Sequence, residues 1–148
     1  MTSYEKYEYW VYLSDYDIQT AADLIKCKRW AYVAFLCQQS VERLVKGMFV
    51  CHTGKDAPKS HNLPYLINTL SQHPKLADTE VGKRLKEEKD NYEDFIIDLM
   101  FYYMSDYPFS YKRVMERFID ENKAMNLYEK TLETLSWLKK FQKAPVNA

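Results

Sequence analysis

The side chains of this chain that could take part in chemistry fall into two groups. The first lies on a helical stretch and the turn after it, and contains Gln38, Gln39, Glu42, Lys46 and His61. Glu42 and Lys46 are four residues apart, so on a helix their charges are neighbours and can pair. The pair is either a surface ion pair or one element of a polar groove beside the two glutamines, and we favour the surface pair.

His61 could serve as a ligand or as a general base. The residues next to it in the sequence do not complete a catalytic relay. We expect its main role to be structural, with its ring fixing the loop against neighbouring helices through hydrogen bonds.

The second group surrounds the segment MSDYPFSYKR, residues 104–113. Its aromatic rings could stack on nucleic-acid bases while its basic residues meet phosphate. The same aromatic residue types are enriched at protein interfaces. Since 21 basic residues balance 21 acidic ones, no overall positive charge attracts nucleic acid, and we favour a dimer interface. The residues concerned are Tyr102, Tyr103, Asp106, Tyr107, Phe109, Tyr111, Lys112 and Arg113.

Composition argues against several other kinds of site. The three cysteines, Cys27, Cys37 and Cys51, are odd in number and lack zinc-ligand spacing, which favours free thiols in a reducing compartment. No apolar run approaches the roughly eighteen residues of a transmembrane helix, and the N-terminus lacks the apolar segment of a signal peptide. We therefore expect a soluble, cytoplasmic protein with no metal, no cofactor and no membrane partner.

Helices must position these groups, because only three Gly and five Pro interrupt the 148 residues and no alternation typical of strands persists. We expect helices over about residues 3–28, 30–52, 63–73, 79–104 and 120–142. The short connection between the first two implies antiparallel packing. The expected fold is all-α, an antiparallel up-and-down bundle of four to five helices. It forms one domain over residues 1–143, followed by a frayed tail at 144–148.

Apolar residues that recur every three or four positions predict which helix faces are buried. Leu44 lies at the centre of the stripe on the second helix. For the last helix, which Asp120 can cap, the expected buried residues are Met125, Tyr128, Leu132, Leu135 and Leu138.

Four short motifs occur in a recognisable order. The stretch RWAYVAFLCQQSVERLVKG at 29–47 precedes SHNLPYL at 60–66, and DYP at 106–108 precedes LSWLKKF at 135–141. Their order and spacing resemble those of the HEPN family of small helical bundles over nearly the whole chain. The resemblance points to Gln38, Gln39, Glu42, Lys46 and the Ser60–Leu63 turn as motif positions.

The resemblance implies a dimer, and many members of the family are partners of nucleotidyltransferases in toxin–antitoxin pairs. Active members resemble metal-independent ribonucleases that use an Arg followed, four to six residues later, by a His. Here Asp106 stands where the family has Arg, and no His follows His73. A carboxylate would repel a phosphate rather than bind it.

We therefore expect no catalytic residues and a binding or partner module. Its expected partners are a second copy of the chain and either a nucleotidyltransferase-type protein or a nucleotide or RNA end. One alternative is a divergent metal-independent ribonuclease toxin that uses Tyr111, Lys112 or Arg113. Another is a purely structural, self-associating bundle.

Overall fold

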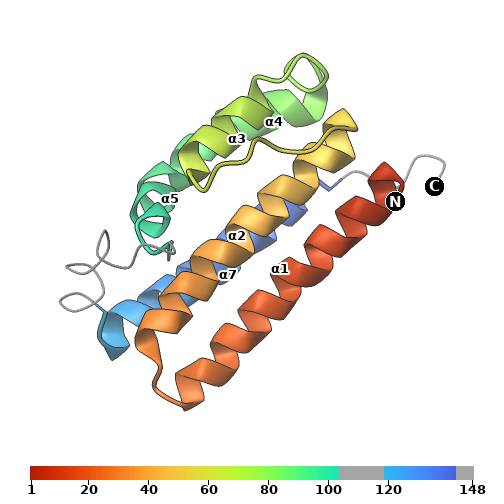
Figure 1. The fold of residues 1–148 in the computed structure, drawn as a ribbon. Coiled ribbons are helices and arrows are strands. Elements are labelled where there is room, and N and C mark those ends of the chain that lie inside the picture. The colour runs from red at the N-terminus through yellow and green to blue at the C-terminus, as the bar shows by residue number, and fades with distance from the viewer. Residues whose placement is uncertain (104–118, 143–148) are drawn as a thin grey trace.

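The computed structural model describes residues 1–103 and 119–142 (Figure 1). All the regular structure in these two ranges is helical. The elements are α1 (Ser3–Lys26), α2 (Trp30–Thr53), α3 (Leu63–Ser71), α4 (Glu80–Glu88), the 3₁₀ helix η1 (Lys89–Tyr92), α5 (Glu93–Met100) and α7 (Glu121–Lys139). The prediction of an all-α fold is therefore confirmed.

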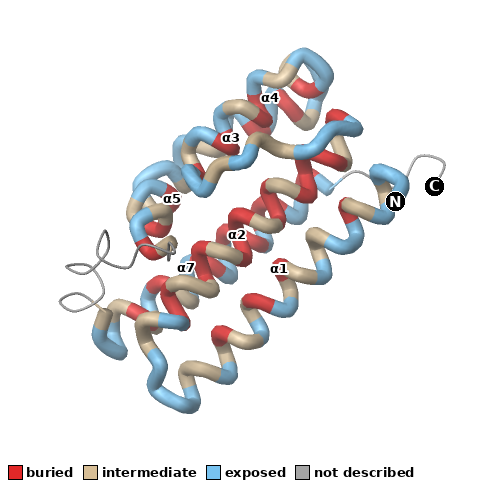
Figure 2. Tube along the Cα trace, in the orientation of Figure 1, coloured by how far each residue is buried: buried red, intermediate tan, exposed pale blue. Residues whose placement is uncertain are grey.

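The helix α2 lies at the centre of the bundle, in contact with α1, α3, α5 and α7. Along the chain, α1, α2, the α4–α5 arm and α7 alternate in direction, while the short α3 packs between α2 and that arm (Figure 1). This is the up-and-down bundle of four to five helices that the sequence predicts. Figure 2 shows buried positions along much of α2, whereas α1 is buried on one side only.

Local sequence sets the ends of the helices that frame the site. Thr2 and Glu5 form a capping box at the start of α1, where each side chain accepts a backbone N–H from the other residue. Gly54 ends α2 with a left-handed φ of 72°, a conformation that favours glycine. Asn62 caps α3 by accepting the backbone N–H of Tyr65. The connecting segment 54–62 therefore has a fixed start and a fixed end.

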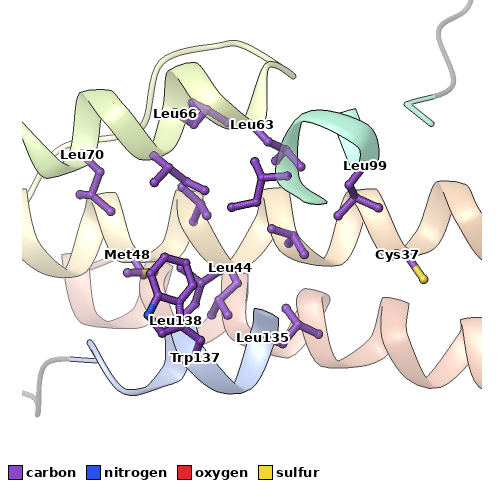
Figure 3. Close-up of a cluster of buried hydrophobic side chains, with 14 of the residues drawn as sticks. Cys37, Leu44, Met48, Leu63, Leu66, Leu70, Leu99, Leu135, Trp137 and Leu138 are labelled. Carbon is purple, nitrogen blue, oxygen red and sulfur yellow. The ribbon is translucent and has the colours of Figure 1, made fainter. Parts of the chain in front are cut away.

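The core gathers leucines from α2, α3, α5 and α7 around Leu44, which has no exposed surface (Figure 3). Leu44 is buried as predicted. In the last helix the prediction is confirmed for Leu135 and Leu138, which are buried, and wrong for Leu132, which is 42% exposed. Met125 and Tyr128 are partly buried, and Thr131 and Thr134 are buried instead. In the first half of α7 the most buried residues therefore lie one position before the predicted ones, at Ala124, Leu127 and Thr131.

The predicted continuous helix over 79–104 is also wrong. The chain leaves α-helical geometry at η1, resumes it in α5 and ends that helix at Met100. At the end of η1, Tyr92 stacks on Trp137 of α7 with ring centroids 4.1 Å apart. This contact ties the arm formed by α4, η1 and α5 to the last helix. The predicted C-terminal tail, residues 144–148, lies outside the described residues.

Candidate functional site

A buried carboxylate, Glu42, lies at the centre of the site. Its side chain is only 7% exposed, and it accepts hydrogen bonds from three side chains. Gln38 Nε2 is 2.9 Å from Oε1, Lys46 Nζ is 3.0 Å from Oε2, and His61 Nδ1 is 3.0 Å from Oε2. We call Gln38, Glu42, Lys46 and His61 the Glu42 cluster.

The expected surface ion pair between Glu42 and Lys46 is therefore formed, but it is buried. The Lys46 side chain is only 13% exposed, and it lines a groove between α1 and the connecting segment 54–62. An ion pair removed from water is stabilising only when its remaining hydrogen-bonding capacity is used. Gln38 and His61 use that capacity for Glu42.

Helix periodicity and one turn of the chain bring the Glu42 cluster together. Gln38, Glu42 and Lys46 are spaced by four residues, which places them along one stripe of α2. After Gly54 the connecting segment folds back along α2, so His61 reaches a residue nineteen positions earlier. At the end of the segment Ser60 Oγ accepts the backbone N–H of Asn62, 3.1 Å away.

His61 fixes the connecting segment against α2, as the sequence predicts. Its Nδ1 lies within 3.1 Å of both Glu42 carboxylate oxygens. Its ring also stacks on that of Tyr103, with centroids 3.8 Å apart and planes 14° from parallel. The sequence pattern missed Glu42 as the partner of His61, because the two are joined only by the return of the chain.

The bonding pattern limits what the Glu42 cluster can do chemically. With Nδ1 donating to an ionised carboxylate, Nε2 is the ring nitrogen left to exchange a proton with a ligand. The His61 side chain is half exposed, so such a ligand can approach it. Lys46, however, is neutralised by Glu42 and is not a free cation.

Gln39 belongs to a different cluster from Gln38. Its Nε2 lies 3.4 Å from Asp17 Oδ1 of α1, and Arg43 lies 3.1 Å from the same oxygen. Burial raises the pKa of Asp17, while Arg43 and Gln39 act in the opposite direction. The polar groove that the sequence suggests beside both glutamines is thus split in two, with Gln39 joining α1 to α2.

Of the second group of candidate residues, the structure describes only the first two, Tyr102 and Tyr103. Tyr103 is half-buried and stacked on His61, whereas Tyr102 is 4% exposed and packs in the core. The Lys123 ammonium lies 5.9 Å above the Tyr102 ring. Tyr102 is therefore not available to stack on a base. The other candidates lie outside the described residues: Asp106, Tyr107, Phe109, Tyr111, Lys112 and Arg113.

Neither a metal-binding cluster nor a membrane-spanning helix is found in residues 1–103 and 119–142. Within these ranges no group of three or more His, Cys, Asp or Glu side chains is arranged to hold a metal ion. In the same ranges no helix is both long enough and apolar enough to cross a membrane.

Comparison with known proteins gives one match. The family model described as the HEPN domain matches residues 7–141, a range that includes both groups of candidate residues. No curated protein and no solved structure matches the chain.

Proposed function

Because the chain belongs to the HEPN domain family, we propose that it is a binding module without ribonuclease activity, whose ligand is a nucleotide or the phosphate-bearing end of an RNA. It works as a cytoplasmic homodimer, and its protein partner is a nucleotidyltransferase-type protein of a toxin–antitoxin pair. The family relationship supports a function linked to nucleotides, RNA or toxins. The choice of binding over catalysis rests on the residues of this chain.

The observation that carries the proposal is that Glu42 already pairs with Lys46, the cation of the Glu42 cluster that could otherwise bind a phosphate. Lys46 and His61 each lie 3.0 Å from Glu42 Oε2. A ribonuclease needs a cation or a donor aimed at the charge that develops on phosphorus. Lys46 is already neutralised, and the sequence lacks the Arg and His pair of active family members.

The first experiment measures RNA cleavage by the purified chain with a chelator present. We expect single-stranded RNA and transfer RNA to remain intact, because the sequence lacks the Arg and His pair of active family members, and loss of a phosphate-binding cation alone removes about 3 kcal/mol of barrier lowering. His61→Ala and Lys83→Ala serve as matched variants, since Lys83 is an exposed residue of α4. All three proteins should give the same background rate.

Ribonuclease activity is the second candidate function, and the geometry of His61 favours it. A carboxylate that holds Nδ1 orients the ring as a general base through Nε2. If the wild type cleaves RNA and His61→Ala abolishes cleavage without lowering the melting temperature, the non-catalytic proposal is wrong. If instead Tyr111→Phe or Arg113→Ala abolishes cleavage, the active site belongs to residues 104–113.

The dimer is tested separately. Ile97 and Phe101, 38% and 52% exposed, form an apolar surface at the end of the α4–α5 arm, next in sequence to the tyrosines at 102 and 103. Such a surface supports a twofold interface in this region. Light scattering over a dilution series should show a dimer for the wild type and a monomer for Phe101→Asp. A wild type that stays monomeric at high micromolar concentration would contradict the dimer.

A further inference from the structure

A groove beside the Glu42 cluster, which shares Lys46 with it, runs between the start of α1 and the connecting segment 54–62. Its volume is about 430 Å³. Small-molecule sites typically measure about 300–1,000 Å³, so the groove has the size of a single-nucleotide site. The lining residues that matter for recognition are Lys6, Tyr9, Trp10, Lys46, Asp56 and Lys59.

The charge of the groove suits an anion. Three lysines and one aspartate line it, and Lys46 is already held by Glu42. Lys6 pairs with Asp56 at 3.3 Å, across the mouth between α1 and the connecting segment, with side chains 42% and 73% exposed. Within the described part of the chain, no carboxylate lies within ion-pair distance of the exposed Lys59 ammonium. An exposed pair of this kind contributes at most about 1 kcal/mol, so a polyanion can displace Asp56 from Lys6.

The aromatic wall of the groove has a structural basis. Trp10 lies against Gly47 of α2, where an added Cβ would come within 2.9 Å of Trp10 Cβ. Glycine at position 47 therefore allows α1 to approach α2 closely, and Trp10 lines the groove together with Lys46. Tyr9, the residue before Trp10 in α1, is 54% exposed. Two neighbouring aromatic side chains can receive a base by stacking, whichever base it is.

We propose that this groove binds a nucleoside phosphate, with the phosphates at Lys6 and Lys59 and the base against Tyr9 and Trp10. The phosphate replaces Asp56 as the partner of Lys6, which frees that end of the connecting segment while His61 still holds the other end on Glu42. This inference rests on the proposed function and gives it a site separate from residues 104–113.

Titration calorimetry on the full chain tests the site with four probes: ATP, inorganic tripolyphosphate, and one tetranucleotide RNA with and without a 5′-phosphate. We expect ATP or the phosphorylated RNA to bind, and the unphosphorylated RNA to bind much more weakly. A free nucleotide and an RNA end carry the same phosphate group. Whichever of ATP and the phosphorylated RNA binds with the higher affinity shows which of the two classes of ligand the groove takes. Tripolyphosphate that matches ATP would overturn the part assigned to Tyr9 and Trp10.

Matched variants then locate the binding. Lys6→Ala and Lys59→Ala should each weaken binding about tenfold, because each removes a charge-assisted contact. Asp56→Asn should strengthen it, because it removes the carboxylate that competes for Lys6. Lys83→Ala, an exposed lysine on α4, should leave the affinity unchanged.

The calorimetry gives one result if the groove is the wrong site and a different result if the protein does not bind nucleotides at all. If the wild type binds but the double variant Lys6→Ala with Lys59→Ala binds equally well, the groove is excluded and the proposed function stands. If no phosphate compound binds the wild type, nucleotide binding itself is wrong and the site is excluded with it.

Discussion

The helices α1 and α2 have the same length of 24 residues and pack against each other along the bundle, yet they are buried to very different extents. Four residues of α1 are buried, compared with fourteen of α2. The reason is their position, because α2 also contacts α3, α5 and α7. The difference has a chemical consequence. Polar residues of α2 need partners within the protein, whereas α1 can leave three tyrosines, Tyr9, Tyr12 and Tyr16, in solvent.

The sharpest test of the central position of α2 is Leu44→Ala. Leu44 is completely buried, so the substitution should lower the free energy of unfolding by about 2–5 kcal/mol. Leu132→Ala is the matched control, since Leu132 is 42% exposed and should change stability by less than about 0.5 kcal/mol. Urea unfolding measures both. Equal midpoints for the two variants would show that α2 is not the centre of the core.

At the contact between α1 and α2, Asp17 should give a smaller effect on the free energy of unfolding than Leu44, and this effect should depend on pH. Burial raises the pKa of this carboxyl group, so the folded state keeps the proton at pH values where the unfolded state has released it. The stability of the wild type relative to Asp17→Asn should therefore fall as pH rises from about 4 through the folded-state pKa. Unfolding of both proteins across a pH series provides the measurement. A difference that is constant with pH would mean that Arg43 fully offsets the burial.

Substitutions on the outer face of α1 should change the free energy of unfolding least. Tyr12 is 58% exposed, and its ring centroid lies 6.3 Å from that of Tyr9 and 6.1 Å from that of Tyr16. Tyr12→Ala should change the free energy of unfolding by less than about 0.5 kcal/mol. Thermal unfolding at two protein concentrations checks this. A larger loss that depends on concentration would show that the outer face of α1 is covered by a second copy of the chain.

Periodicity predicts the two long N-terminal helices to within about two residues, because large apolar side chains dominate their buried faces. In α7 the same reasoning finds the buried Leu135 and Leu138 but fails at Leu132, which is exposed while Thr131 and Thr134 are buried. The Thr134 hydroxyl donates to the carbonyl oxygen of Lys130 at 2.8 Å, which removes much of the cost of burying it. A pattern that counts only large apolar residues does not predict that such threonines are buried.

The candidate site was predictable only where its parts lie on one helix. The spacing of Gln38, Glu42 and Lys46 places them on a common stripe, and the structure pairs them there. Two other side-chain contacts cannot be read from a local sequence pattern. His61 contacts Glu42, nineteen residues earlier, and Lys6 contacts Asp56, fifty residues later. Both depend on the path of the connecting segment 54–62. That path follows from how α1, α2 and α3 pack and not from a repeat in the sequence.

The short link between α1 and α2 also bears on the order in which the chain folds. Only residues 27–29 separate the two helices, and Lys28 turns the chain with a left-handed φ of 59°. Contacts between elements close in sequence form fastest, because little chain entropy is lost in closing a short loop. We expect the α1–α2 hairpin to form early in folding and to present the apolar face of α2 as a template. The arrival of α7, which meets α2 only after a long intervening stretch of chain, would then be a late step that completes the core.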